Sequence, residues 1–361
     1  MWATRCALSK IDAMLTEFAG KTAVVTGAGS GFGLELARLA GQRGMRLVLA
    51  DVQADALEQA SQELRAQGVP VMPFVLSVSD SAAMQAMADA VQGDLWFQLY
   101  VLKEHAFNDQ LVQRAQVAGY GTLVVTLDLQ AGGKRERDLR NGITVPLRLN
   151  LRQVLSGMAH PTWAWQMLRS GSPQYENVKG YMGQQSANLT IAAKVGQSLD
   201  PAFDWDNLAR LRDRWKGQLM VKGVAHPDDA WRLAQMGVDT LWISNHGGRQ
   251  LDGAAATLDA LPAIASRLAG KMPLLIDSGV RRGVDILKAH TLGAKAVAVG
   301  RAVLYGAAAG GEAGARHALQ ILIDELRLSM KLSGLARLGD SPALLAPQMH
   351  GDHPAPAVVS G

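Results

Sequence analysis

Short apolar runs alternate with amphipathic stretches along most of the chain. The apolar runs are mostly continuous, which is typical of parallel strands that are buried on both faces. They cover residues 22–27, 45–51, 71–77, 95–101, 121–128, 218–223, 240–246, 273–279 and 296–301. Stretches with helical spacing lie between them, for example Asp55–Gln67, Ser81–Val91 and Ala225–Met236. This alternation predicts βα units and therefore an α/β fold built on parallel sheet.

The spacing of the predicted strands suggests how the chain is divided. A closed (βα)8 barrel needs eight strands, and the chain offers one more than that. Residues 147–217 carry no obvious strand, which predicts a helical or loop insertion. The tail 341–361 is rich in Pro, Gly and Ala and is expected to be disordered. We therefore expect an N-terminal extension over 1–20, βα units over 21–92 and a barrel portion over 93–340.

Composition and charge exclude several classes of protein. Hydrophobic residues make up 48% of the chain, enough for a large core, and the net charge of 36 − 32 = +4 comes without a long basic run. Nucleic acid is therefore not an expected partner. The single cysteine, Cys6, rules out an intrachain disulfide and a cysteine metal cluster, and we expect no metal. The apolar runs are too short to span a bilayer, and the first residues lack a secretory signal pattern, so we expect a cytoplasmic protein.

A glycine-rich turn follows the first predicted strand. It reads TGAGSGFG from Thr26 to Gly33 and opens a predicted helix, and Asp51 ends the next strand. Glycines in this position let the backbone approach a pyrophosphate at a helix N-terminus, and the acid can accept from a ribose hydroxyl. The alternative is that the glycines only make a tight βα turn.

These residues resemble the opening of a short-chain dehydrogenase/reductase, from about Lys21 to Val91. The resemblance implies a half-Rossmann βαβαβ unit and NAD(P). The same family carries an Asn-Ala-Gly strand end, a catalytic Ser and a Tyr-x-x-x-Lys motif. Tyr175 and Lys179 have that last spacing, but no predicted strand precedes them and the other motifs are missing. The segment thus offers about half of a dinucleotide fold without its chemistry.

The C-terminal two-thirds place polar side chains at the ends of predicted strands. The densest motif, SNHGGRQLD, begins at Ser244. Its His246 is a candidate general base, and Arg249 can hold a carboxylate with its two-pronged guanidinium. Asp128 ends another strand and can pair with the imidazole ring, and Lys222 ends a third. The carboxyl ends of barrel strands are where active sites form.

The motifs in this part of the chain resemble those of the FMN-dependent α-hydroxy acid dehydrogenase/oxidase family, especially its mandelate dehydrogenase-like members. The resemblance covers about Gly93 to Asp340. It rests on the motifs FQLY, KRERD, VKG, SNHGGRQLD, DSGVRRG and VGRAVLYG, which occur in this order. It implies a (βα)8 TIM-barrel-like fold, FMN as the cofactor, and oxidation of a mandelate- or lactate-like 2-hydroxy acid to the 2-oxo acid.

The resemblance also implies roles for individual residues. His246 takes the substrate proton, and Asp128 orients and stabilises it. Arg135 and Arg249 hold the substrate carboxylate, and Tyr100 contacts the hydroxyl region. The implied cofactor residues are Gln98 and Thr126 on the flavin ring, Lys222 beside its negative charge when reduced, and Ser244, Asp277, Gly279, Arg281, Gly300 and Arg301 around the ring, ribityl chain and phosphate.

The first two barrel strands of that family have no counterpart in this chain, which therefore looks like a chimera with a junction near Gln92–Gly93. We expect the strands at 45–51 and 71–77 to take the two vacant barrel positions, with 71–77 pairing with 95–101. The strand at 22–27 is then surplus. Ser77 would lie where the family places a flavin-binding serine.

Two alternatives to the flavoenzyme remain from the sequence. One is an NAD(P)-binding short-chain dehydrogenase-like protein, and the other is a catalytically incomplete fusion. The electron acceptor is not indicated. Some members of the flavin family use an insertion to lie on a membrane surface, so peripheral contact at the inner face of the membrane stays open, as does a homo-oligomer.

Overall fold

A computed structural model describes residues 19–29, 31–51, 53–75, 95–133 and 198–344, together with the single positions 136, 140 and 159. Arg135, Ser77, Tyr175, the predicted helix at 81–91 and most of the predicted insertion lie outside the described residues. Within the described ranges, no helix has both the length and the apolar character needed to cross a membrane.

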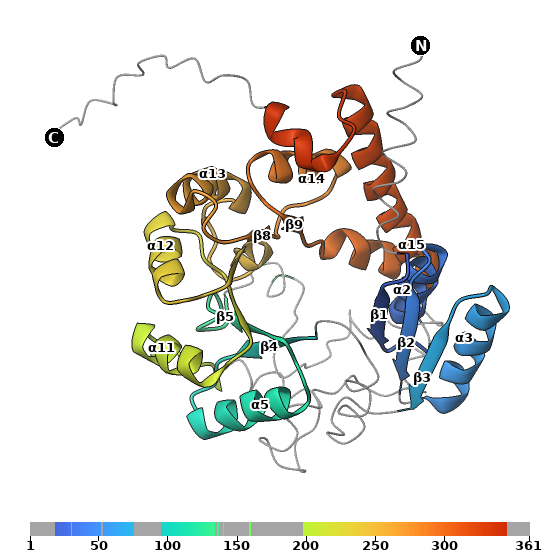
Figure 1. The fold of residues 1–361 in the computed structure, drawn as a ribbon, viewed down its shortest axis with the longest axis horizontal. Coiled ribbons are helices and arrows are strands. Elements are labelled where there is room, and N and C mark those ends of the chain that lie inside the picture. The colour runs from blue at the N-terminus through green and yellow to red at the C-terminus, as the bar shows by residue number, and fades with distance from the viewer. Residues whose placement is uncertain are drawn as a thin grey trace.

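The N-terminal βα units form a separate three-stranded parallel sheet in the order β1-β2-β3. Two helices connect its strands (Figure 1). The elements are β1 (Thr22–Thr26), α2 (Gly31–Gln42), β2 (Arg46–Asp51), α3 (Ala54–Ala66) and β3 (Val71–Val75). Leu47, Leu49, Leu57 and Leu64 are buried in a core that belongs to this unit alone.

The rest of the chain builds a six-stranded parallel sheet in the order β4-β5-β6-β7-β8-β9. The strands are β4 (Trp96–Tyr100), β5 (Thr122–Thr126), β6 (Gln218–Lys222), β7 (Thr240–Ile243), β8 (Leu274–Ile276) and β9 (Ala296–Val297). The helices between them, in chain order, are α5 (His105–Val117), α11 (Trp205–Arg214), α12 (Pro227–Gln235), α13 (Thr257–Leu268) and α14 (Gly283–Thr291). Figure 1 shows these helices following one another around the outside of the sheet.

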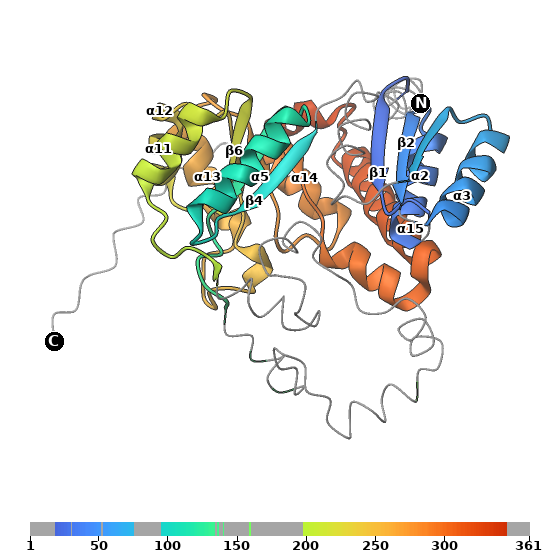
Figure 2. The same ribbon diagram turned by 90° about the horizontal axis from the view of Figure 1, so that it is seen from below.

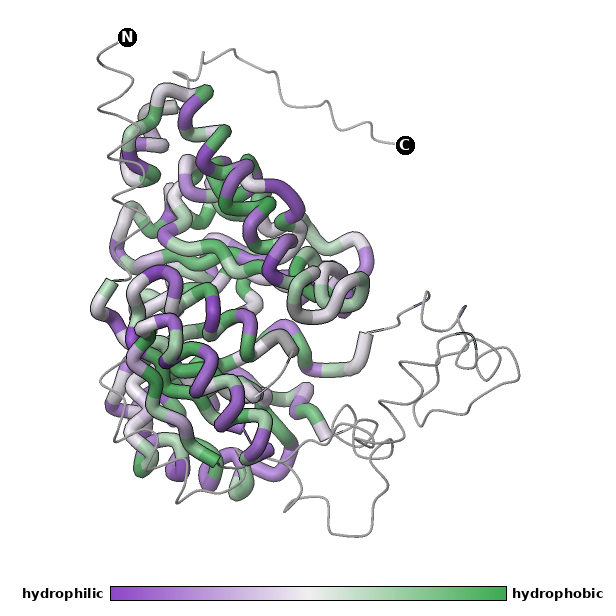
Figure 3. Tube along the Cα trace, turned by 90° about the vertical axis from the view of Figure 1, so that its right-hand side faces the viewer, coloured by the Kyte–Doolittle hydropathy of each residue, from purple (hydrophilic) through white to green (hydrophobic). Residues whose placement is uncertain are grey.

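The main core lies between this sheet and its helices. Alternate strand residues such as Leu123, Val221, Leu241 and Ile243 are fully buried there. Along the helices in Figure 3, hydrophilic and hydrophobic positions alternate, as expected when one face packs on a sheet. Because side chains alternate along a strand, the residues between these core positions face the other side of the sheet.

The expected completion of the barrel is wrong for the described part of the chain. β3 pairs only with β2, and β4 pairs only with β5, so the strand at 71–77 does not extend the larger sheet. The strand at 22–27 is not surplus, because it pairs with β2 over its whole length. The physical reason is that two short βα crossovers connect the three N-terminal strands into a sheet with a core of its own.

The two sheets are joined through the last long helix, α15 (Arg301–Leu332), which packs on both α14 and α2 (Figures 1 and 2). The helix folds back on itself at Gly311, whose φ of 58° suits glycine. Its two halves touch at Gly306 and Gly314, where an added Cβ would lie 2.1–2.4 Å from the opposite carbonyl oxygen. Beyond it, the 3-10 helix η3 spans Leu338–Leu344 and packs on α14. The disorder expected over 341–361 is therefore wrong for residues 341–344, because Ser341 is fully buried and contacts His290 of α14.

A buried ion pair fastens the small unit to this helix. Glu35 on α2 is 2% exposed and pairs with Arg316 of α15 and with Arg38. A third link is apolar, because Leu95, next to β4, packs on Val48 and Ala50 of β2.

The nine predicted strands are all present, and the predicted helices at 55–67 and 225–236 are confirmed as α3 and α12. Within the predicted insertion, the described part contains α11, which connects β5 to β6.

Candidate active site

The register of the six-stranded sheet brings four polar or aromatic side chains into one row. Tyr100 is opposite Thr126, Thr126 is opposite Lys222, and Lys222 is opposite Trp242. All four lie on the face of the sheet away from the helices, at or near the carboxyl ends of their strands. This is the end where active sites of βα folds form.

His246 and Asp128 form the centre of the site. Nδ1 of His246 lies 3.0 Å from Oδ1 of Asp128, and both side chains are less than a fifth exposed. His246 sits in the 3-10 turn η2 (His246–Gly248) directly after β7, with a φ of 55° that is rare for a residue with a side chain. Strained backbone of this kind concentrates at functional sites. The distance between Nδ1 and Oδ1 shows that the predicted pairing of these two side chains is present.

A close contact fixes the position of Asp128. An added Cβ at Gly223, which has a φ of 99°, would lie 2.6 Å from Cγ of Asp128. Only glycine can fill this position without pushing the carboxylate away from His246. The second oxygen of Asp128, Oδ2, is buried and has no partner among the described residues.

Tyr100 faces the same space. Its ring centroid lies 6.3 Å from that of His246. Burial raises the pKa of the Tyr100 hydroxyl, and the charges of Asp128 and Asp277 raise it further. The phenol therefore stays protonated and can donate a hydrogen bond. Beside it, Nε2 of Gln98 donates to Oγ1 of Thr126 at 2.8 Å.

Lys222 is a buried cation held at the strand ends. It is 6% exposed, donates to Oγ of Ser244 at 2.7 Å, and lies 3.4 Å from Oδ2 of Asp277. Oγ of Ser244 also accepts from the backbone N–H of His246 at 3.1 Å. Ser244 thus connects the buried cation to the turn that carries the histidine.

Asp277 and Ser278 extend this network to the next strand. Oγ of Ser278 donates to Oδ1 of Asp277 at 2.6 Å and accepts from the backbone N–H of Gly247 at 2.9 Å. Sequence reasoning passed over Ser278, although it stands between two predicted site residues. The only available signal was its place in the DSG motif at a strand end.

Of the two arginines predicted to hold the substrate carboxylate, the described residues include only Arg249. Arg249 is exposed at the end of the turn that carries His246. Arg135 lies outside the described residues, but the loop that leads to it is held close by. Gly133 donates its N–H to Oε1 of Gln250 at 2.8 Å, and an added Cβ at Gly133 would lie 2.5 Å from the carbonyl oxygen of Arg249. Sequence reasoning also missed this role of Gln250.

The predicted phosphate residues lie at the ends of β8 and β9. Arg301 begins α15 and donates to the carbonyl oxygen of Gly247 at 2.5 Å, so it reaches into the site. Arg281 is exposed and donates to the carbonyl oxygen of Val280. Gly279 and Gly300 have open space where a Cβ would stand. The structure thus brings Arg301 to the turn of His246 and leaves Arg281 at the surface.

The glycine-rich turn of the small unit is arranged differently. Asp51 is 9% exposed, and both of its carboxylate oxygens accept backbone N–H groups, from Gly29 at 2.9 Å and Gln53 at 2.9 Å. The acid that was expected to accept from a ribose hydroxyl is therefore used to hold its own loop.

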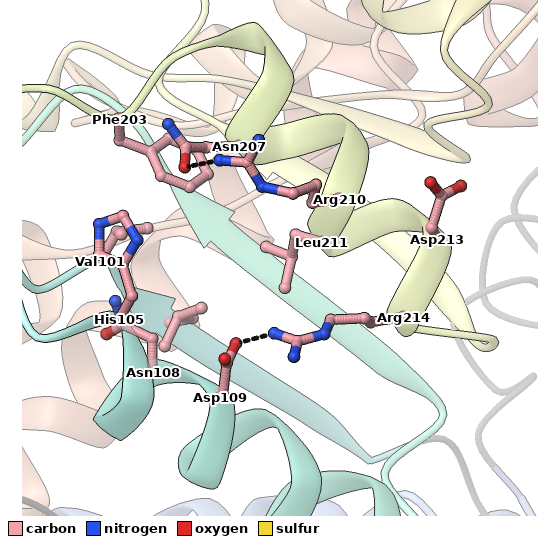
Figure 4. Close-up of a pocket in the computed structure, with 11 residues that line it drawn as sticks. Val101, His105, Asn108, Asp109, Phe203, Asn207, Arg210, Leu211, Asp213 and Arg214 are labelled. Atoms are coloured by element: carbon pink, nitrogen blue, oxygen red, sulfur yellow. Dashed lines mark hydrogen bonds and ion pairs between the residues drawn. The ribbon is translucent and has the colours of Figure 1, made fainter.

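A cavity of about 510 Å³ lies elsewhere, on the outer side of β4 between α5 and α11 (Figure 4). His105, in its wall, belongs to a second histidine–aspartate pair, since its Nε2 lies 2.9 Å from Oδ2 of Asp200. Asp109 pairs with Arg214 across it, and Asn207 accepts from Arg210. Leu99 lines this cavity and faces the helices, whereas Gln98 and Tyr100 face the other side of β4, so the cavity is separate from the site of His246.

Comparison with known protein families gives one match that covers most of the chain. Residues 52–346 match the model of the family described as "FMN-dependent dehydrogenase". The match begins N-terminal to the expected junction at Gln92–Gly93 and takes in α3 and β3. It contains all the predicted site residues.

Individual relatives agree with the family match. The chain is 39% identical over 283 residues to an L-lactate dehydrogenase of Stenotrophomonas maltophilia, which covers 78% of this chain and 74% of the relative. Among solved structures it resembles the monotopic membrane protein (S)-mandelate dehydrogenase, with a TM-score of 0.66, 34% identity, and coverage of 88% of this chain and 78% of the other. A mandelate oxidase matches with a TM-score of 0.55 and 28% identity, over 85% of this chain and 71% of the other.

Proposed function

Because the chain belongs to the FMN-dependent dehydrogenase family, we propose that it oxidises a small 2-hydroxy acid, mandelate- or lactate-like, to the 2-oxo acid. Membership of the family makes it an oxidoreductase with FMN as cofactor. The observation that carries the choice of substrate class is the His246–Asp128 pair, which lies at the strand ends with Tyr100 and a strand-end lysine.

The side chains at the strand ends suit FMN. Lys222 is a buried cation, and Ser244, Thr126 and Gln98 add hydroxyl and amide groups on the same face of the sheet. At the ends of β8 and β9, Arg301 supplies a guanidinium, and Gly279 and Gly300 leave open space. We assign the ring to Gln98, Thr126, Lys222 and Ser244, and the ribityl chain and phosphate to Asp277, Gly279, Arg281, Gly300 and Arg301. When bound, FMN accepts the two electrons and one hydrogen that the substrate loses.

His246 acts as the base. Oxidation of a 2-hydroxy acid to a 2-oxo acid removes two electrons and two protons, and His246 takes one of these protons. Its Nδ1 is occupied by Asp128, so Nε2 is the atom that receives the proton. Asp128 then faces the imidazolium and keeps the ring in its orientation.

The substrate is held through its carboxylate and its hydroxyl group. Arg249 lies at the end of the turn that carries His246, and we assign it to the carboxylate together with Arg135. A guanidinium can hold both carboxylate oxygens at once. The protonated Tyr100 donates a hydrogen bond toward the hydroxyl group of the substrate. Its ring lies beside that of His246, on the face of the sheet away from the main core.

The test is the visible absorption spectrum of the purified protein with and without added FMN, followed by mandelate or L-lactate under anaerobic conditions. We expect an oxidised-flavin spectrum that bleaches when the hydroxy acid is added. Retained flavin that does not bleach with either acid would contradict the substrate class. Protein that takes up no FMN would favour a catalytically incomplete fusion.

We also propose that residues 21–92 are a half-Rossmann unit joined to a TIM-barrel portion over 93–340, with an extension over 1–20 and an insertion over 147–217. The separate sheet and core of β1–β3 support this division. An NAD(P)-dependent activity has no support, because Asp51 is occupied by its own loop. Measuring binding of NADH to the protein by fluorescence tests this, and we expect none.

The location and assembly of the protein are part of the same proposal. We propose a cytoplasmic enzyme that makes peripheral contact with the inner face of the membrane and forms a homo-oligomer. Its (S)-mandelate dehydrogenase relative is a monotopic membrane protein, which supports the peripheral contact. Fractionation of cells in low and high salt, followed by size-exclusion chromatography, tests both statements.

A further inference from the structure

The buried ammonium of Lys222 has a third neighbour that the mechanism above does not use. The ring of Trp242, the residue opposite Lys222 on β7, lies with its centroid 5.4 Å from Nζ of Lys222. Leu241 and Ile243, on either side of Trp242 in sequence, are fully buried against the helices. Trp242 therefore faces the site side of the sheet together with Lys222.

Three groups compete for the ammonium of Lys222. Ser244 accepts at 2.7 Å, while Asp277, on the next strand, lies 3.4 Å away. An isolated carboxylate attracts a buried ammonium more strongly than a hydroxyl does, so these two contacts alone would let the ammonium move toward Asp277. The negative face of an indole ring attracts a cation within about 6 Å, most strongly where water is excluded.

The indole of Trp242 is not held in place by a hydrogen bond of its own. Its Nε1 is buried and has no acceptor among the described residues, whereas Nε1 of Trp215 donates to the carbonyl oxygen of Gln218 at 2.9 Å. A buried donor without a partner destabilises the fold. An apolar residue would avoid that cost, so the ring face toward Lys222 is the property that distinguishes tryptophan here.

We propose that Trp242 is a positioning residue that holds the Lys222 ammonium on the cofactor side of the sheet and limits how closely it approaches Asp277. The inference rests on the proposed function in taking Lys222 to face the bound flavin. Removal of the ring lets the ammonium move toward Asp277, which neutralises more of its charge. Reduced FMN carries more negative charge than oxidised FMN, so a weaker cation makes the flavin harder to reduce.

The experiment compares two substitutions in the FMN-loaded protein, Trp242→Leu and Trp242→Phe. Each variant is reduced in the presence of a reference dye, and the ratio of oxidised to reduced flavin is read from the visible spectrum at a fixed dye potential. We expect W242L to raise that ratio about 3- to 30-fold, as a cation–π contact in a dry site predicts. W242F keeps a ring face and should stay close to the wild type.

Trp231→Leu is the matched control. Nζ of Lys271, which follows α13, lies 3.9 Å from the centroid of the Trp231 ring on α12, in the same kind of contact. W231L should leave the flavin ratio unchanged. Equal ratios in wild type, W242L and W242F would overturn the proposal, and so would equal shifts in W242L and W231L.

A second measurement avoids any substitution that could prevent folding. Fluorinated tryptophan incorporated into the wild-type chain weakens the negative face of the ring and hardly changes its size. We expect the flavin to become harder to reduce with each added fluorine, and to show no such trend in W242F. A flat trend in the wild type overturns the proposal even if the protein bleaches with a hydroxy acid, in which case the proposed function stands. Failure of the wild type to take up FMN overturns both.

Discussion

The three-stranded unit and the six-stranded sheet follow the same construction rule and differ in what their strand ends do. In both, parallel strands are connected by helices and the core lies between sheet and helices. At the end of β2, both carboxylate oxygens of Asp51 accept hydrogen bonds from backbone N–H groups of its own unit. After β5, one carboxylate oxygen of Asp128 contacts His246, and the other has no hydrogen-bond partner among the described residues.

This difference teaches how to separate a structural carboxylate from a reactive one in a βα fold. A carboxylate that accepts local backbone N–H groups with both oxygens stabilises its own loop. A carboxylate that faces a histidine, with a strained backbone and a buried lysine nearby, orients a proton acceptor instead. The sequence presents both as an acid at or just after a strand end.

The largest expected effect comes from removing the base. His246→Ala should lower kcat by about 10²–10⁴ or more, since a positioned general base contributes that much, while FMN stays bound. Turnover of mandelate or L-lactate and the flavin spectrum measure both parts. His105→Ala removes a side chain from the wall of the cavity in Figure 4 and breaks its pair with Asp200, and this control should retain activity. Loss of flavin together with activity in His246→Ala would make His246 a structural residue.

Truncations in the two cores test whether the two regions are energetically separate. Leu57→Ala in the small unit and Leu241→Ala in the large sheet each remove a fully buried side chain. Each should cost about 2–5 kcal/mol of unfolding free energy in its own core. Thermal unfolding followed by circular dichroism and by flavin fluorescence should show early FMN release only for Leu241→Ala. Early release in both variants would mean that the two regions unfold as one.

A smaller effect is expected at the substrate arginine. Arg249→Lys keeps the charge but loses the two-pronged geometry, so kcat/KM for the hydroxy acid should fall about 10-fold, mostly through KM. The affinity for FMN, measured by flavin fluorescence, should not change. The same substitution at exposed Arg210, on α11, is the control. Kinetics identical to the wild type in Arg249→Lys would remove Arg249 from the substrate site.

The smallest expected effect is a pH dependence of the unfolding free energy, caused by His290 on α14. Burial lowers the pKa of His290 from 6.5, with a further contribution from Lys295, and Nδ1 of His290 lies 3.0 Å from Oγ of Ser341. The folded state therefore favours neutral His290, so its contribution to stability is present above about pH 6.5 and is lost as the pH falls. His290→Gln should flatten the decline in unfolding free energy between about pH 7 and 5. Exposed His317→Gln should leave it as in the wild type.

Much of the fold was accessible to prediction because it depends on local pattern. Continuous apolar runs and helical spacing predict all nine strands and the helices α3 and α12, since burial on two faces or on one face dictates which residues are apolar. The strand-end motif around His246 and the acid at Asp128 indicate the site for a similar reason. Arg249, three residues after His246, is the residue type that binds a carboxylate with two hydrogen bonds.

The amino-acid sequence by itself determined the βα alternation and the flavin-family motifs, and it predicted the contact between His246 and Asp128. Only the tertiary structure decided that β3 joins β2 and not β4, because a parallel strand can pair with either neighbour and the choice depends on which core closes around it. The same holds for the contacts of Asp128 with Gly223, of Gly133 with Gln250 and of Lys222 with Trp242. These contacts join residues from different strands and loops, and their distances are set by sheet register and packing, which no local pattern records.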